Sequence, residues 1–504
     1  MPLHQFLPSV LHCKPPMDDL QVQGLHFVLF PHLIPGHMIP MIDIARLLAK
    51  RGMVVTIFTT PLNAARFASV LIRAAESGLQ IRVKELNFPY GEAGLPQGFE
   101  NLDMVFSADD AFKFLSAIPM LQQPAEELFE DLTPRPSCII SDFFMRWTAP
   151  LAAKFHVPRI SFNGFSCICN LCIHNIHNSR VLENISSDFE YFAVPGFPDH
   201  IKITIAQLPG LLKPTARELL DRMFAAESLS LGMIVNTFEE LESEYVKEYR
   251  KLKGNRVWCI GPVSLSNTHN LDKLERGNKT SFDENECFKW LDSQEPRSVA
   301  YACLGSVSNL TPSQLKELGL GLEASGRPFI WVLREGNKSK DMDKWISEDG
   351  IEERIKGRGL IIRGWAPQVL ILSHQAIGGF LTHCGWNSIL EAISMGLPII
   401  TWPQFEDQFC NEKLVTQVLK IGVSVGVFRP PFGEEEKAGV LAKKDDFTKV
   451  IDSLMSEGDE GEERRMRARE LGEMANRSVE EGGSSYINLT LLIQCIMQQA
   501  TGKK

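Results

Sequence analysis

The sequence predicts an α/β protein with two Rossmann-like domains that face a central cleft. The chain has 504 residues, more than the roughly 250–300 residues that one hydrophobic core serves. Each half alternates short apolar runs with longer stretches of helical periodicity, which is typical of parallel sheets flanked by helices. A polar segment without periodicity, residues 263–286, separates the halves. Ligands of such sheets bind beyond the carboxyl ends of the strands, so we expect the site in the cleft.

The first half begins with a βαβαβ pattern. The run HFVLF at residues 26–30 has the continuous apolar character of a buried parallel strand. Residues 38–50 carry apolar side chains at helical spacing and are followed by Gly52, a residue type that ends helices. Further strands are expected at residues 54–60, 81–86, 137–141 and 158–162, and further helices at residues 61–78 and 145–155.

The second half repeats this alternation. Strands are expected within residues 298–306, 328–334, 359–365, 377–383, 397–403 and 421–427, helices at 311–326 and 386–396, and charged amphipathic helices over residues 447–499. The predicted organisation is a disordered leader at residues 1–23, a first domain at 24–262, a linker at 263–286, a second domain at 287–480 and a C-terminal helix at 481–504.

Charge and cysteine usage restrict the partners and the compartment. The chain has 52 Lys and Arg against 62 Asp and Glu, a net charge of −10, whereas a nucleic-acid partner requires a basic surface. A small anion is compatible with this charge because a helix N-terminus binds phosphate locally. No run approaches the roughly 18–20 apolar residues of a transmembrane segment. The leader lacks secretory features and the 11 Cys are scattered, so we predict a cytoplasmic protein with reduced thiols.

The most informative segment is residues 365–408, which contains the run HCGWNS between a predicted strand and a predicted helix. Gly385 frees the backbone turn, and Asn387 and Ser388 fall in the first helical turn. The unpaired N–H groups and side chains of such a turn bind phosphate. His383 adds a hydrogen-bond donor beside that anion. The pattern therefore predicts a phosphate site.

The same segment contains groups suited to the rest of a nucleotide sugar. Glu391 lies one turn along the helix, and its carboxylate can accept from two vicinal ribose hydroxyls. Trp365 offers a flat face on which a base can stack. Asp407 and Gln408 follow the next predicted strand and are typical readers of sugar hydroxyls.

This segment resembles the signature box of the plant family-1 UDP-dependent glycosyltransferases. The resemblance rests on Trp365–Gln368, His374, Gly378, Phe380, His383–Ser388, Glu391, Gly396, Pro398, Pro403 and the final pair Asp407 and Gln408. A Rossmann unit alone requires only its glycines. The match of many further residue types at fixed spacing therefore favours the family over a generic Rossmann unit. The likeness extends over nearly the whole chain apart from the leader.

The resemblance implies the GT-B architecture, with an N-terminal acceptor domain, a C-terminal donor domain and a last helix that packs back on the first domain. It also implies roles in the donor site. Trp365 stacks on uracil, Ala366 holds the base edge through its backbone, Gln368 and Glu391 bind ribose, Ser306, His383, Asn387 and Ser388 bind the diphosphate, and Trp386, Asp407 and Gln408 hold the sugar. Gln408 is the family's usual mark for glucose, while Asp407 stands where many members have Glu.

The loop FPHLIPGHMIP carries the second part of the resemblance. Its Gly-His element implies that His37 is the catalytic base and that Asp142, in SDFFMRW, is its partner. A histidine of near-neutral pKa can take the proton of an acceptor hydroxyl, and a carboxylate orients its ring. Taken alone, a histidine in such a loop is more often structural. His32, in the same loop, is the alternative base.

The implied activity is metal-independent, inverting transfer of glucose from UDP-glucose to a hydroxyl of a small lipophilic plant metabolite. The runs WAPQVLILSH and GHMIPMIDIA resemble the subgroup that acts on flavonoids, triterpenoids and steroids. No cofactor or metal is expected, UDP-glucose is a co-substrate, and the enzyme is expected to be a monomer. The alternatives are a non-catalytic binding protein, which would lack His37 or Asp142, and an NAD-dependent oxidoreductase, whose glycine fingerprint is absent.

Three other features have a competing interpretation. Asp341 and Asp343 form a DxD motif, but they lie in a charged run typical of a solvated loop. The segment CICNLCIHNIH at residues 167–177 resembles a zinc site but lacks two separated ligand pairs, so we expect a pocket-lining helix with buried thiols. Candidate apolar walls of the acceptor pocket are Phe99, Phe106, Phe143, Phe144 and Phe165.

Overall fold

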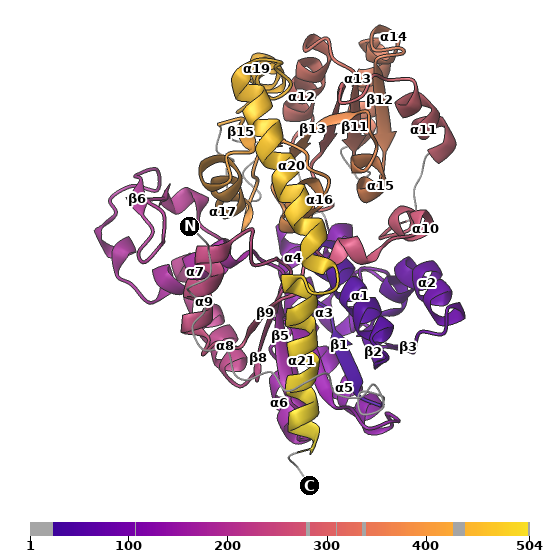
Figure 1. Ribbon diagram of the computed structural model, residues 1–504, viewed down its shortest axis with the longest axis vertical. Coiled ribbons are helices and arrows are strands. Elements are labelled where there is room, and N and C mark those ends of the chain that lie inside the picture. The colour runs from indigo at the N-terminus through magenta and orange to yellow at the C-terminus, as the bar shows by residue number, and fades with distance from the viewer. Residues whose placement is uncertain are drawn as a thin grey trace, which may run out of the picture.

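The computed structural model describes residues 24–105, 107–278, 283–308, 310–334, 339–426 and 439–501. The predicted leader lies outside these ranges. The chain forms two α/β halves, each built on a parallel sheet, so the predicted fold class is confirmed (Figure 1). Below, the first half is the part of the chain before residue 263, and the second half begins at residue 284.

The sheet of the first half has seven strands in the order β3-β2-β1-β4-β5-β8-β9, and all neighbours are parallel. The strand order reverses between β1 and β4, so the loops after these two strands open onto one crevice. β8 and β9 have four and three residues, too few for a predictable pattern. The strands are β1 (His26–Phe30), β2 (Val54–Thr59), β3 (Ile81–Glu85), β4 (Cys138–Asp142), β5 (Arg159–Asn163), β8 (Gly232–Val235) and β9 (Val257–Cys259).

Helices cover both faces of this sheet. α1 begins with Pro35, a residue type that suits the first turn because its missing N–H costs nothing there. The helices are α1 (Pro35–Lys50), α2 (Pro61–Glu76), α3 (Tyr90–Ala93), α4 (Ala108–Ala117), α5 (Gln122–Glu130), α6 (Thr148–Lys154), α7 (Cys167–His177), α8 (Arg217–Ser228) and α9 (Ser243–Leu252). A short hairpin pairs β6 (Phe192–Ala193) with β7 (Lys202–Ile203).

The sheet of the second half has six parallel strands in the order β12-β11-β10-β13-β14-β15. Its order reverses between β10 and β13, which places a second crevice beyond these two strands. The strands are β10 (Val299–Cys303), β11 (Phe329–Leu333), β12 (Gly359–Arg363), β13 (Ile377–Thr382), β14 (Ile399–Thr401) and β15 (Gly422–Ser424).

One helix of the second half corrects a prediction. The run that contains Asp341 and Asp343 is α13, not a solvated loop, because Met342 and Ile346 lie four residues apart and are buried in the core of this half. The helices are α11 (Glu284–Asp292), α12 (Pro312–Ala324), α13 (Ser339–Glu348), α14 (Ile351–Arg354), α15 (Gln368–Leu372), α16 (Trp386–Ser394), α17 (Gln408–Lys413), α19 (Lys444–Leu454), α20 (Asp459–Val479) and α21 (Ser484–Thr501).

The segment between the halves contains two short helices, η8 (Val263–Ser266) and α10 (Asn270–Leu274). Polar pairs fix it to α1. Asn267 Nδ2 donates to Asp43 Oδ1 at 2.8 Å, and Arg46 donates to both Asn267 and Asp272. Polar contacts of this kind leave no hydrophobic periodicity in the sequence.

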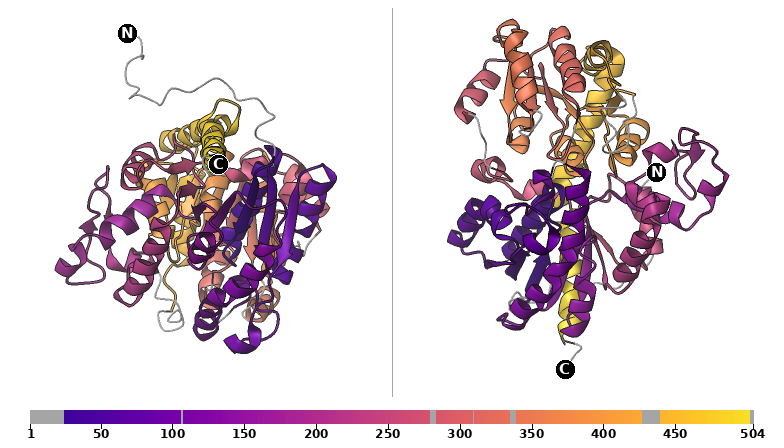
Figure 2. Two further views of the ribbon diagram at one scale, coloured as in Figure 1. Left: turned by 90° about the horizontal axis from the view of Figure 1, so that it is seen from below. Right: turned by 180° about the vertical axis from the view of Figure 1, so that it is seen from behind.

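The last two helices connect the halves. α20 packs against α16 of the second half, and α21 returns to the first half, as Figures 1 and 2 show. The apolar side of α21 joins the core of the first sheet through Leu489, Leu492, Ile493, Ile496 and Met497. None of the helices within the described ranges has the length and apolar character needed to cross a membrane.

Two adjacent leucines of α21 test this packing. Leu492 is fully buried, whereas Leu491 is 42% exposed. We expect Leu492→Ala to lower the free energy of unfolding of the first half by about 2–5 kcal/mol, because truncation of a buried leucine leaves a cavity. Leu491→Ala should change it by less than about 0.5 kcal/mol. Urea denaturation followed by tryptophan fluorescence measures both, and equal effects would contradict the packing.

Candidate active site

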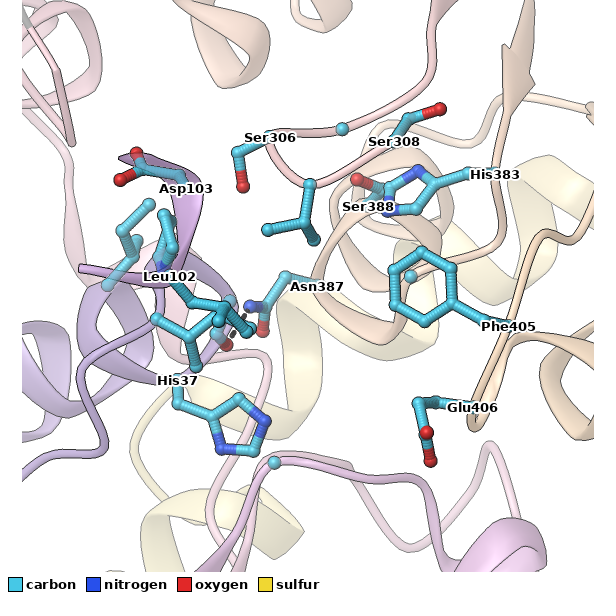
Figure 3. A pocket seen from close by; sticks show the side chains of 18 of the residues that line it. His37, Leu102, Asp103, Ser306, Ser308, His383, Asn387, Ser388, Phe405 and Glu406 are labelled. Carbon is cyan, nitrogen blue, oxygen red and sulfur yellow. Dashed lines mark hydrogen bonds between the residues drawn. The ribbon is translucent and has the colours of Figure 1, made fainter. Parts of the chain in front are cut away.

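The two crevices open into one cavity of about 2110 Å³ between the halves. All of the predicted catalytic and donor-site residues except Asp142 line it, and Asp142 lies fully buried behind His37. Figure 3 shows His37 of the first half on one side of the cavity and His383 and Ser388 of the second half on the other, with Asn387 between them. The cavity therefore brings residues far apart in the sequence around one space.

His37 and Asp142 meet because β1 and β4 are neighbours in the sheet. His37 lies in the first turn of α1, directly after the loop that follows β1, and Asp142 ends β4. The Nδ1 of His37 lies 2.7 Å from Asp142 Oδ2. The other carboxylate oxygen accepts the backbone N–H of Phe144 at 3.0 Å. The carboxylate thus fixes the ring and directs Nε2 as the atom that exchanges a proton with a ligand.

The charges of this pair support each other. Burial lowers the pKa of His37, but the negative charge of Asp142 and the hydrogen bond outweigh it, so the net pKa is raised above 6.5. Burial raises the pKa of Asp142, and the charge and hydrogen bond of His37 reverse this to a net lowering. Asp142 therefore stabilises the imidazolium that forms when His37 accepts a proton.

His32, the alternative base, has a different environment. Burial lowers its pKa to about 4, and its ring stacks on Phe144 with centroids 5.1 Å apart. Its Nδ1 has no hydrogen-bond partner among the described residues. Without a carboxylate on its ring, His32 is the weaker base, and the geometry favours His37.

Across the cavity, the N-terminus of α16 faces the ligand space. Gly385 is the N-cap residue and makes no side-chain cap, and Asn387 and Ser388 lie in the first turn. Backbone N–H groups at such a terminus are oriented toward an anion, and the helix dipole adds to the attraction. Ser306, on the loop after β10, lines the same region.

His383 lies between two glycines that leave room for its ring. A Cβ on Gly305, or one on Gly385, would lie 2.5 Å from an atom of the ring, so neither position accepts a side chain without movement. Burial lowers the pKa of His383 to about 4. The ring is therefore neutral near pH 7 and serves as a hydrogen-bonding group rather than as a cation.

The residues expected around a nucleoside form a connected group. Gln368 Nε2 donates to Glu391 Oε2 at 2.7 Å and to Ser388 Oγ at 3.0 Å. Trp365 and Ala366, on the loop after β12, line the cavity next to them. A carboxylate, an amide and an aromatic ring in this order offer groups for a ribose and a base.

A third set of cavity residues carries the groups expected around a sugar. Burial raises the pKa of Asp407 to about 7, although a 2.7 Å hydrogen bond from Asn411 and the charge of His37 oppose the rise. The Gln408 Oε1 accepts the backbone N–H of Gln404 at 2.8 Å. The indole N–H of Trp386 donates to a first-half carbonyl at 2.7 Å. These contacts orient the three side chains.

One hydrogen bond connects the loop that carries His37 directly with the helix that carries the expected phosphate site. Asn387 Nδ2, at the start of α16, donates to the carbonyl of Gly36 at 2.6 Å, and Figure 3 marks this contact with a dashed line. Gly36 immediately precedes His37. The histidine and the anion-binding helix are thus held at a defined separation.

Comparisons with known proteins identify the family. The profile of the family described as "UDP-glucoronosyl and UDP-glucosyl transferase" matches residues 274–428. UDP-glycosyltransferase 73C25 of Barbarea vulgaris is 55% identical over 480 residues, which cover 94% of this chain and 97% of the relative. The chain belongs to the plant family-1 UDP-glycosyltransferases.

Solved structures extend the likeness to the fold of this UDP-glycosyltransferase. Glycyrrhiza uralensis UGT73P12, complexed with glycyrrhetinic acid 3-O-monoglucuronide, is 35% identical and has a TM-score of 0.85. The alignment covers 95% of this chain and 97% of that chain. Phytolacca americana UGT2, complexed with UDP-2fluoro-glucose and pterostilbene, is 27% identical, with a TM-score of 0.73 and coverage of 94% of this chain and 100% of that chain. The two halves form the GT-B fold of these enzymes.

Some site residues of the glycosyltransferase were not predicted. Arg276, in the segment between the halves, pairs with Glu391. Glu406 lines the cavity and accepts the backbone N–H of Gly210 at 3.1 Å across the two halves. Neither belongs to a recognisable motif. The only signal for Glu406 was its place before Asp407, and a single arginine in a polar linker gives none.

Only some of the predicted acceptor walls lie at the cavity. Phe99, Phe144 and Phe165 line the cavity, whereas Phe143 is buried in an apolar cluster behind it and Phe106 lies outside the described residues. The prediction that α7 lines the pocket is wrong. Its three cysteines, Cys167, Cys169 and Cys172, are buried as expected, in the apolar clusters on which the helix packs.

The DxD motif and the Cys/His-rich segment do not form metal sites among the described residues. Asp343 lies partly exposed in the wall of the cavity and accepts a hydrogen bond from Arg363 Nε at 2.7 Å. Within the described residues, no three His, Cys, Asp or Glu side chains gather closely enough to hold a metal ion.

Asp142→Asn tests the electrostatic part of this site. The variant removes the negative charge that raises the pKa of His37, while burial continues to lower it. We therefore expect the pKa of His37 to fall below 6.5. An NMR titration of Cε1-labelled histidines measures it, with assignment by a His37→Gln variant. The pKa of His26, whose shift arises from burial, Pro134 and Arg82, should stay unchanged. An unchanged or raised pKa of His37 would contradict the pairing.

Proposed function

We propose that this UDP-glycosyltransferase transfers glucose from UDP-glucose to a hydroxyl of a small lipophilic metabolite, with inversion at the anomeric carbon and without a metal ion. The observation that carries the proposal is the pair of His37 and Asp142 facing the N-terminus of α16 across one cavity. This arrangement supplies a base for the acceptor and an anion site for the leaving group in the same space.

In the proposed step, the Nε2 of neutral His37 accepts the proton of the acceptor hydroxyl. The oxygen attacks C1 of glucose from the face opposite UDP, the C1–O bond to the diphosphate breaks, and its electron pair leaves with UDP. Asp142 stabilises the imidazolium that results. Because His37 must be neutral, the rate should rise as pH increases through its pKa, which lies above 6.5.

The leaving group would be bound by the second half. The N–H groups at the start of α16, with Asn387, Ser388 and Ser306, provide donors for the diphosphate. His383, neutral because of burial, adds one further hydrogen bond. Oriented donors of this kind stabilise developing charge without a cation, which supports metal-independent transfer.

The nucleoside and the sugar would occupy the two sides of that diphosphate. Trp365 and Ala366 would hold uracil, and Gln368 and Glu391 the ribose. Trp386, Asp407 and Gln408 would hold glucose. All three line the cavity, and the charges of His37 and Asp407 affect each other's pKa, which supports a sugar position next to His37. Glucose as the sugar rests on the family resemblance of Gln408.

The acceptor class follows from the other part of the cavity. Its walls are largely apolar and include Phe99, Leu115, Phe144, Phe165, Leu211 and Met223. Such a surface favours a polycyclic or aromatic acceptor with few polar groups. The ligands named for the two solved relatives are a triterpenoid glucuronide and the phenolic stilbene pterostilbene. The first supports a triterpenoid acceptor and the second a phenolic one such as a flavonoid, whereas a steroid rests on the family resemblance.

We further infer a monomeric, cytoplasmic enzyme. All residues of the proposed mechanism come from one chain. The described cysteines are free thiols and mostly buried, which suits a reducing compartment.

Replacing His37 tests the proposed base. We expect His37→Ala to lower transfer by about 10²–10⁴-fold, the usual contribution of a general base. Its affinity for UDP should stay unchanged, because the diphosphate is held by the second half. The assay uses UDP-glucose and a panel of triterpenoid, steroid and flavonoid acceptors, read by mass spectrometry, with UDP binding measured by calorimetry.

His32→Asn is the matched control, since it changes a histidine of the same loop that has no carboxylate partner. It should lose far less activity than His37→Ala. A larger loss in the control, or full turnover by His37→Ala, would overturn the proposal. Chelation by EDTA should leave the wild-type rate unchanged, and a large loss would contradict the metal-free step.

A further inference from the structure

Arg276, in the segment between the halves, bridges them inside the protein. Its side chain is 8% exposed. Nε donates to Asp43 Oδ2 on α1 at 2.8 Å, Nη2 forms an ion pair with the same oxygen at 2.7 Å, and Nη1 donates to Glu391 Oε1 on α16. A planar guanidinium can make these contacts in two directions at once, which an ammonium group cannot do with the same geometry.

Asp43 is a fixed anchor for this arginine. Its carboxylate is 2% exposed, and its second oxygen accepts from Asn267 at 2.8 Å. One guanidinium thus lies between two buried carboxylates, Asp43 and Glu391. Two carboxylates share one guanidinium, so the oxygen atoms that face the cavity still favour additional hydrogen-bond donors.

Glu391 is held from both sides by these contacts. Arg276 occupies one lone pair of Oε1, and Gln368 Nε2 donates to Oε2 at 2.7 Å. An ionised carboxylate has about four acceptor positions, so each oxygen keeps one for a ligand. Arg276, Gln368 and Glu391 all line the cavity. A carboxylate fixed in this way is suited to two neighbouring hydroxyls.

The next residue contacts the expected base platform. Gly277 has a φ of +131°, and a Cβ there would lie 2.3 Å from Cζ2 of Trp365. The backbone of the segment is therefore packed directly on the indole ring. Two consecutive residues contact Glu391 and Trp365, which are the groups proposed for ribose and uracil.

We propose that Arg276 is a positioning residue of the donor site: anchored by Asp43, it fixes the carboxylate of Glu391 to receive the ribose hydroxyls of the nucleoside diphosphate sugar. The segment between the halves is thereby a third wall of the donor site. The inference rests on the proposed function, because it takes Glu391 as the ribose ligand.

The test compares UDP-glucose with its analogue that lacks the ribose 2′-hydroxyl. We expect Arg276→Gln to raise KM for UDP-glucose and the Kd for UDP about tenfold or more, the scale of one hydrogen bond to a charged group. The kcat should change much less, because the lost contact is the same in the ground state and the transition state. The preference of the wild type for the ribose donor over its 2′-deoxy analogue should largely disappear.

Arg276→Lys is the conservative variant. It keeps the positive charge but not the planar guanidinium that contacts two carboxylates at once. Relative to Arg276→Gln, it should recover part of the affinity for UDP and part of the preference for the ribose donor. If Arg276→Gln proves unstable, the comparison of Arg276→Lys with wild type by calorimetry with UDP and 2′-deoxy-UDP still decides the matter. A wild-type preference in the lysine variant would then overturn the inference.

Arg73→Gln is the matched control. Arg73 donates to Asp272 at 3.0 Å and pairs with Glu275 in the same segment, but among the described residues none of its hydrogen bonds or ion pairs reaches Glu391 or Trp365. It should leave KM and the 2′-hydroxyl preference unchanged. If Arg73→Gln and Arg276→Gln lose the preference equally, the segment acts only through its general stability and the inference is wrong.

Glu391→Gln separates this inference from the proposed function. If this variant keeps the 2′-hydroxyl preference, Glu391 is not the ribose ligand, and both proposals about it fall. If Glu391→Gln loses the preference while Arg276→Gln keeps it, the donor site stands as proposed and only the role of Arg276 is overturned.

Discussion

The site depends on one constraint, the reversal of strand order in each parallel sheet. Loops on the two sides of such a reversal lead away in opposite directions and leave a crevice at the carboxyl ends of the strands. In the first sheet the reversal lies between β1 and β4, and in the second between β10 and β13. The two crevices face each other, so His37 and Asp142 come from one and Ser306 and His383 from the other.

The separation of these groups is controlled by contacts that cross between the halves. Asn387 holds the loop before His37, Arg276 connects α1 with Glu391, and α21 buries its apolar side in the first core. The first two are polar and lie in the cavity wall, whereas the third is apolar and lies far from it. Stability of the assembly and alignment of the site are thus largely supported by different interactions.

Local charge, rather than net charge, suits the cavity to a dianionic ligand in a chain of net charge −10. The groups that face the expected diphosphate are neutral: helix-end N–H groups, Asn387, Ser388 and a histidine whose pKa burial lowers to about 4. Ionic contacts occur at the ribose end, where Arg276 lies between two carboxylates.

The sequence supported the alternation of strands and helices and the residues of the donor segment, because apolar runs and closely spaced motifs are local features. It did not reveal β8 and β9, which are too short for a period, or α13, whose two buried residues are hidden among charges. Arg276 escaped notice for another reason. Its importance comes from two carboxylates more than 100 positions away in either direction, and such a relation exists only in the folded chain. The distinction between Phe143 and Phe144 likewise depends on which face of one loop points to the cavity.

The most direct test of the account is a crystal structure of the enzyme with UDP-2-fluoro-glucose and an acceptor identified by the mass-spectrometric panel. The account predicts the diphosphate at the N-terminus of α16 and the acceptor oxygen about 2.6–3.2 Å from Nε2 of His37, on the face of the sugar opposite UDP. A diphosphate bound away from α16, or an acceptor hydroxyl directed at a group other than His37, would contradict it.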